Sequence, residues 1–141
     1  MRILPVIFGA LALAAASSGA SASERWEFLT APQINLSLVY RLDKLSGDVI
    51  ACQYAHNPGK PDVEPGAYGV TNCYRGGDGA VKQEPGDYGL LASRNEQEGG
   101  VYRIDRRSGA ISVCYLYFQR DKQGEAERIL DQYVVCTAPS K

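Results

Sequence analysis

The chain has 141 residues, of which 45% are hydrophobic and 22% are charged, and its formal net charge at pH 7 is −1. This length suits one ordinary domain rather than two independently cored ones. A balance of 15 basic against 16 acidic residues argues against the basic surface that nucleic acid or an anionic membrane would need. We therefore expect no nucleic-acid partner.

The first 22 residues have the pattern of a secretory signal peptide. One basic residue, Arg2, precedes an apolar run over residues 3–16, and the segment ends in Ala20-Ser21-Ala22, an Ala-x-Ala cleavage site. The run is shorter than the roughly 20 residues that a membrane-spanning helix needs. We expect a cleaved leader, no transmembrane segment, and a periplasmic or secreted protein.

Residues 39–52 return as residues 101–114. The first copy reads Val-Tyr-Arg-Leu-Asp-Lys-Leu-Ser-Gly-Asp-Val-Ile-Ala-Cys, and the second reads Val-Tyr-Arg-Ile-Asp-Arg-Arg-Ser-Gly-Ala-Ile-Ser-Val-Cys. Seven of the 14 positions are identical at a constant offset of 62 residues (101 − 39), which also carries residues 26–30 onto 88–92. The sequence predicts an internal duplication, with repeats at 23–75 and 88–141 and a linker at 76–87, the two repeats forming one domain.

The pattern within each repeat is typical of β-strands, because apolar and polar residues alternate. The expected strands are residues 26–30, 38–43, 48–54, 68–74, 88–93, 101–105, 110–118 and 129–137. The predicted fold is all-β: two tandem four-stranded antiparallel meanders, sandwich- or barrel-like, with propeller blades as the alternative. Two blades per chain would need a homo-oligomer to close a ring.

The loop at residues 43–47, Asp-Lys-Leu-Ser-Gly, suits a short hairpin turn and fixes the register of the flanking strands. With Asp43 facing Asp48, Leu42 lies opposite Val49 on one face, which we expect to be the core. Tyr40 and Ala51 share that face, and the expected equivalents in the second repeat are Tyr102, Ile104, Ile111 and Val113. The other face of each hairpin then carries Arg41 or Arg103.

Four cysteines lie beyond the leader, one pair in each repeat. Since a duplication carries its own bridge with it, we predict the disulfides Cys52–Cys73 and Cys114–Cys136. The alternative is a four-cysteine zinc site, but no two cysteines are close enough in sequence to form the usual short ligand turn. We expect no metal and no cofactor.

The candidate ligand-binding residues are Arg41, Arg103 and His56. The two arginines recognise an anionic group in one interpretation, and cover apolar surface or pair with an acid in the other. His56 is the only histidine and lies in a loop pattern, Ala-His-Asn-Pro-Gly. A metal site of His56 with Asp48 or Asp62 has no support from spacing, and we predict no catalytic residue.

These features predict a non-enzymatic binding module of the cell envelope or medium that recognises a glycan or a protein. The alternative is a small exported inhibitor of a hydrolase, in which a disulfide-tied loop at residues 55–67 or 119–128 enters the target's cleft. An enzyme is the third possibility, and it would have to use His56 or unpaired carboxylates.

Overall fold

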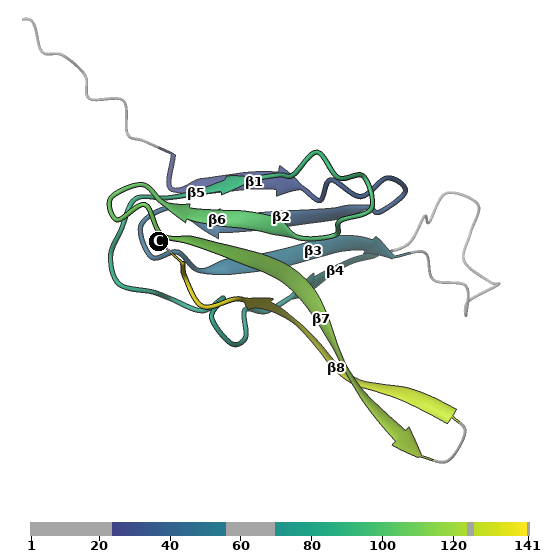
Figure 1. The fold of residues 1–141 in the computed structure, drawn as a ribbon. Helices are drawn as coiled ribbons and strands as arrows, with labels where there is room; N and C mark the ends of the chain where they lie inside the picture. The colour runs from purple at the N-terminus through teal and green to yellow at the C-terminus, as the bar shows by residue number, and fades with distance from the viewer. Residues whose placement is uncertain (1–23, 56–69, 124–125, 141) are drawn as a thin grey trace, which may run out of the picture.

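The structure is a computed structural model that describes residues 24–55, 70–123 and 126–140. It confirms the all-β prediction: in those residues there is no helix, and the strands form two four-stranded antiparallel meanders stacked as a sandwich (Figure 1). The first sheet contains β1 (Trp26–Thr30), β2 (Leu38–Asp43), β3 (Val49–Ala55) and β4 (Val70–Tyr74). The second contains β5 (Tyr88–Leu91), β6 (Val101–Asp105), β7 (Ile111–Gln123) and β8 (Ala126–Cys136).

The two hairpin turns fix the predicted registers. In the first sheet Leu42 pairs with Val49, and in the second Ile104 pairs with Ile111. The Asp43 carboxylate accepts a hydrogen bond from the backbone N of Leu45 at 3.0 Å, and that of Asp105 accepts one from the N of Arg107 at 3.0 Å. Gly47 and Gly109 close the turns at φ 69° and 73°, a left-handed conformation that favours glycine.

The predicted disulfides Cys52–Cys73 and Cys114–Cys136 are both confirmed. Each joins residues that lie directly opposite one another on the last two strands of its sheet. In the chain-entropy model, loops of 21 and 22 residues correspond to about 3 kcal/mol of stabilisation each.

The two sheets stack with their strands running over one another. β5 contacts β1 and β2, and β8 contacts β3 and β4. The Tyr40 hydroxyl of the first sheet donates to the Gly99 carbonyl oxygen at 2.7 Å, and the backbone N of Leu90 donates to Oε1 of Glu27 at 3.1 Å. The core therefore lies between the sheets.

The predicted core face is correct for the first sheet and wrong for the second. Tyr40, Leu42, Val49 and Ala51 are all 0% exposed. In the second sheet the opposite face of the hairpin is buried, and its members are Val101, Arg103, Ser112 and Cys114. The reason is the stacking: two sheets placed over one another in the same orientation meet through opposite faces.

The last two strands are longer than predicted and form an arm, residues 117–123 and 126–133, that projects from the sandwich (Figure 1). The charge-rich segment 119–128 was expected as a loop, but its described residues, 119–123 and 126–128, continue the antiparallel pairing, with a register shift between Gln119 and Arg120. Charged side chains are tolerated there because water can reach both faces of a hairpin that no other strand covers. In the described part of the chain, no helix is long and apolar enough to cross a membrane.

Tyr40 gives the fold a testable dependence on pH. Its burial raises the pKa of the hydroxyl to about 12, whereas tyrosine in an unfolded chain ionises at about pH 10. The folded protein thus holds the hydroxyl proton more tightly than the unfolded chain does. The stabilisation from the protonated hydroxyl is present below about pH 10 and is lost as the pH rises from about 10 to about 12. We expect Tyr40→Phe to be about 1 kcal/mol less stable at neutral pH, because it loses a hydrogen bond.

The stability difference between Tyr40→Phe and wild type should shrink, and then reverse, between about pH 10 and pH 12, because phenylalanine has no proton to lose. Urea denaturation of both proteins across this range measures it. A difference that stays constant would show that Tyr40 ionises as readily in the folded protein as in the unfolded chain.

Candidate functional site

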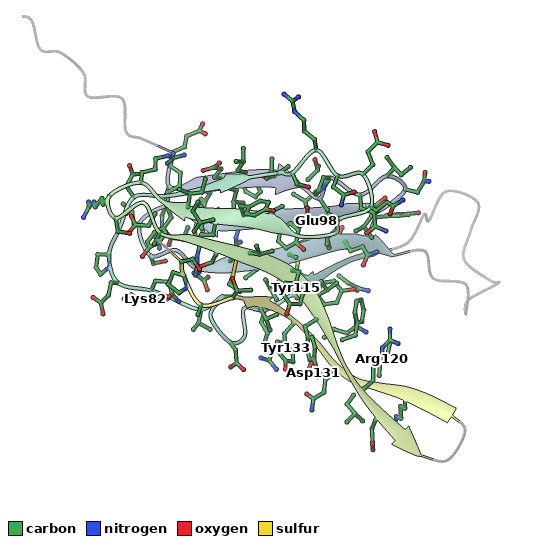
Figure 2. All side chains as sticks on the ribbon, viewed as in Figure 1. Lys82, Glu98, Tyr115, Arg120, Asp131 and Tyr133 are labelled. Atoms are coloured by element: carbon green, nitrogen blue, oxygen red, sulfur yellow. A yellow bond between two sulfur atoms is a disulfide. The ribbon has the colours of Figure 1, made fainter. Side chains whose placement is uncertain are left out.

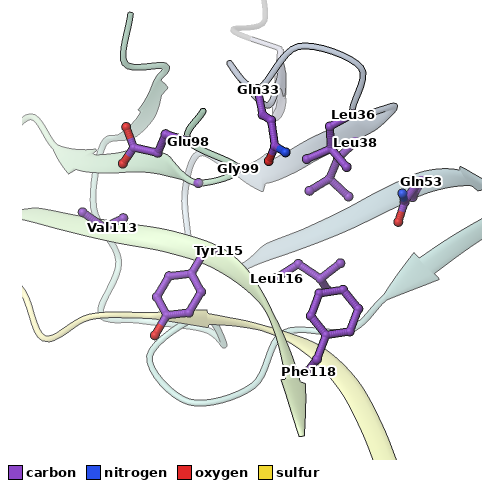
Figure 3. Close-up of a pocket in the computed structure, with 11 residues that line it drawn as sticks. Gln33, Leu36, Leu38, Gln53, Glu98, Gly99, Val113, Tyr115, Leu116 and Phe118 are labelled. Atoms are coloured by element: carbon purple, nitrogen blue, oxygen red, sulfur yellow. The ribbon is translucent and has the colours of Figure 1, made fainter. Parts of the chain in front are cut away.

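A cleft of about 440 Å³ opens between the two sheets. It lies at the end of the sandwich away from the two hairpin turns, where β7 bends away from β3 toward the arm. The residues that line it are Gln33, Leu36, Leu38, Gln53, Glu98, Gly99, Gly100, Val113, Tyr115, Leu116 and Phe118. Figure 3 shows Leu36 and Leu38 on one side of the cleft and Leu116 and Phe118 across from them.

The wall of the cleft is mainly aliphatic and aromatic, with a few polar groups. Glu98 and the amides of Gln33 and Gln53 are the polar side chains among the lining residues apart from the Tyr115 hydroxyl. Oε1 of Gln53 lies 3.4 Å from the Tyr74 hydroxyl, a long hydrogen bond that leaves the amide nitrogen available. Such a cleft can hold an apolar group while its amides orient a polar backbone.

Gly99 brings the second sheet close to the loop between β1 and β2. A Cβ at this position would lie 3.1 Å from Oε1 of Gln33 and 3.6 Å from Cδ2 of Leu36. A larger side chain at Gly99 would therefore point into the cleft. Within the described residues, no group of three histidine, cysteine, aspartate or glutamate side chains could hold a metal ion.

Arg103, one of the candidate ligand-binding residues, lies buried between the sheets. Nη1 donates to the carbonyl oxygens of Gly47 and Gly79, at 2.9 Å each, and Nη2 lies 3.4 Å from Oγ of Ser112. Burial lowers the pKa of its guanidinium. The same side chain lines a smaller hollow of about 250 Å³ with Tyr88, so a ligand there would compete with the carbonyl oxygens.

Arg41, the equivalent residue of the first repeat, has a different environment. It is half-buried on the face that points away from the second sheet, with Cζ 4.6 Å from the centroid of the Trp26 ring. Its Nε is buried and has no hydrogen-bond partner among the residues that the structure describes. The structure therefore does not bring Arg41 and Arg103 together, and His56 lies outside the described residues.

The arm carries exposed apolar side chains that sequence reasoning did not single out. Tyr117, Phe118, Ile129 and Leu130 are all exposed, and the Tyr117 and Tyr133 rings lie 5.6 Å apart. Arg75 contacts the Tyr133 ring and places Nη2 2.6 Å from Oδ2 of Asp131, so the base of the arm is tied to the residue that follows β4. Figure 2 shows Tyr133 and Asp131 near the base of the arm. The alternation of Tyr115, Tyr117 and Gln119 with Leu116 and Phe118 was the available signal.

The chain matches no protein-family model, no characterised protein and no solved structure in comparisons with each. The interpretation of the cleft and the arm therefore depends on their own geometry.

Arg41 and Arg103 provide a matched pair of substitutions. We expect Arg103→Ala to lower the free energy of unfolding by about 2–4 kcal/mol, because it removes the donors to two carbonyl oxygens between the sheets. Arg41→Ala should cost less than about 1 kcal/mol. Urea denaturation of dilute, oxidised protein measures both, and an equal loss in the two variants would contradict the different packing of the two faces.

Proposed function

We propose that the protein is a non-enzymatic binding module of the periplasm or the medium, and that it recognises a protein partner through the cleft between its sheets. The observation that carries this proposal is the cleft itself, about 440 Å³ of mainly apolar wall with a few polar side chains. The two disulfides fit a small module that works in an oxidising compartment.

The chemistry of the cleft favours a protein over a glycan as the ligand. Leucine, valine and phenylalanine side chains can exclude water from an apolar side chain, but they offer no partners to sugar hydroxyls. Gln33, Gln53 and Glu98 suit a different task, since amides and a carboxylate can pair with the backbone groups on either side of an inserted residue. An extended segment with one apolar anchor matches this arrangement.

The same cleft favours binding over catalysis. Glu98 is the one carboxylate among its described lining residues, and neither a histidine nor a cysteine is among them. General acid–base chemistry on a bound group usually needs a second titratable side chain within reach of the first.

A second candidate function, inhibition of a hydrolase, is favoured by one observation, the projecting arm. Its two strands extend well beyond the Cys114–Cys136 bridge, and Ile129 and Leu130 are exposed on it. A pre-formed hairpin can enter a cleft at a small entropic cost. The test measures inhibition of a panel of secreted hydrolases. Inhibition of one enzyme that is lost in Leu130→Lys, but kept when a residue of the cleft is substituted, would support this function.

The cleft is tested with a library of random peptides, and in parallel with a glycan array, using the oxidised protein secreted from the full chain. We expect selected peptides to share one large apolar residue and to compete with one another. Gly99→Leu, which places a side chain into the cleft, should weaken their binding at least about tenfold.

Lys82→Leu is the matched control, because it adds the same side chain at an exposed loop position away from the cleft. It should leave peptide binding unchanged. If sugars bind instead and Gly99→Leu abolishes their binding, the module recognises glycans. If neither class binds and turnover appears on a hydrolase substrate panel, the proposal is wrong.

A further inference from the structure

The sandwich joins two copies of one repeat through two different faces. The first sheet contributes the face of Tyr40 and Val49, and the second contributes the face of Val101 and Arg103. An interface of this kind is head-to-tail, and unlike a two-fold interface it leaves one unused copy of each contacting face at its two ends. The unused faces here are the outer surfaces of the sandwich.

The outer face of the first sheet is the repeat-equivalent of the buried face of the second. Its members are Trp26, Phe28, Val39, Arg41 and Ile50, which align at the offset of 62 residues with Tyr88, Leu90, Val101, Arg103 and Ser112. Trp26, Phe28 and Val39 are 37%, 63% and 36% exposed, whereas Tyr88, Leu90 and Val101 are 7%, 8% and 0% exposed. The first sheet thus exposes to solvent an apolar surface whose equivalent in the second sheet is buried.

The outer face of the second sheet is likewise the equivalent of the buried face of the first. Its members are Leu91, Tyr102, Ile104, Ile111 and Val113, which align with Leu29, Tyr40, Leu42, Val49 and Ala51. Ile111 is 44% exposed where Val49 is 0% exposed. Both ends of the sandwich therefore have the composition of a core.

The internal interface shows how one such face docks on the other. The Tyr88 ring lies over the first hairpin turn, 3.0 Å from the position of a Cβ at Gly47. Arg103 stands over the Tyr88 ring, 5.9 Å from its centroid, and donates to the Gly47 carbonyl oxygen at 2.9 Å. An aromatic ring and an arginine thus cover the turn of the neighbouring repeat, beside backbone hydrogen bonds that Gln83 and Gly86 of the linker donate to it.

The first sheet carries the same two groups without a turn to hold. Arg41 stands over the Trp26 ring, with Cζ 4.6 Å from the ring centroid, as Arg103 stands over the Tyr88 ring. In the second sheet the equivalent turn is uncovered: among the described residues, nothing lies within 4 Å of the position of a Cβ at Gly109, the equivalent of Gly47. The arginine–aromatic pair lies on the outer face of the first sheet, and the uncovered turn belongs to the second sheet.

We infer that the protein self-associates head to tail, with the outer face of the first sheet packed on the outer face of the second sheet of another copy. Trp26 and Arg41 of one chain then cover the Gly109 turn of the next, as Tyr88 and Arg103 cover the Gly47 turn within the chain. The contact repeats an interface that the duplication has already built once. Val113 is the one residue named on either face that also lines the cleft, so the test substitutes other residues of the two faces.

The test uses one charged substitution on each face, Phe28→Lys and Ile111→Lys, in the oxidised protein secreted from the full chain. In sedimentation velocity over a dilution series, wild type should form species larger than a monomer. Each variant alone should be monomeric, with the dissociation constant raised at least about 100-fold, because a lysine must be buried in the contact.

An equal mixture of the two variants should recover one contact. Phe28→Lys keeps an intact face on its second sheet, and Ile111→Lys keeps one on its first, so the mixture should give a dimer of unlike chains and nothing larger. A two-fold contact would join the same face of two chains. One of the two variants keeps that face intact and would then associate by itself, so the two variants could not both be monomeric alone.

Ile34→Lys is the control, since Ile34 is 58% exposed on the loop between β1 and β2 and belongs to neither face; its association should match wild type. Near-ultraviolet circular dichroism confirms that each variant is folded, and Leu91→Lys replaces Ile111→Lys if the latter is not. Wild type that stays monomeric at every concentration, or folded variants that fail to associate when mixed, would overturn the inference.

Discussion

The hairpin turn shared by the two repeats is the constraint on which the rest of the structure depends. An aspartate that accepts a backbone N–H, and a glycine with positive φ, close a loop of fixed length. The turn sets the register of β2 against β3 and of β6 against β7, and a slip of one residue would exchange the faces of either sheet. Because the two turns fix the same register, equivalent residues lie on equivalent faces of the two sheets. The stacking then buries one face of the first sheet and the opposite face of the second.

Arg103 and Arg41 are one repeated residue placed in two environments. Arg41 lies on an outer face, while Arg103 is taken between the sheets and paired with carbonyl oxygens that include that of Gly47 in the first turn. A buried guanidinium is tolerated only when its donors are satisfied, and here the turn of the neighbouring repeat contributes to satisfying them. The same turn motif therefore determines the register within a hairpin and provides an acceptor between hairpins.

The sequence was sufficient for the features that depend on local pattern and on the duplication. Strand alternation, the registers of both hairpins and the two disulfide pairings all follow from residues close to the turns or from the repeat. The buried face of the second sheet could not be predicted, since both of its faces are apolar enough and the choice depends on the direction of stacking. The arm was not predicted because its charged residues resemble those of a loop. A hairpin that no other strand covers tolerates charged residues equally well.

The candidate site was less accessible to sequence reasoning than the fold. The cleft is lined by residues from both repeats and from two loops, and Leu36 has no special neighbour in the sequence that marks it. It exists because β7 bends away from β3 where the arm begins, a departure from the symmetry of the two repeats. The duplicated residues form the framework, and the unduplicated segments provide the distinctive surface.

The unequal burial of the two disulfides has a consequence for redox chemistry. Cys114 and Cys136 are buried between the sheets, while Cys73 is exposed on the outer face of the first sheet. Thiol–disulfide exchange needs a thiolate to reach one sulfur of the bridge. A reductant therefore attacks the Cys52–Cys73 bridge first and leaves β4 joined to β3 by backbone pairing alone, while the bridge at the base of the arm stays protected until the sheets separate.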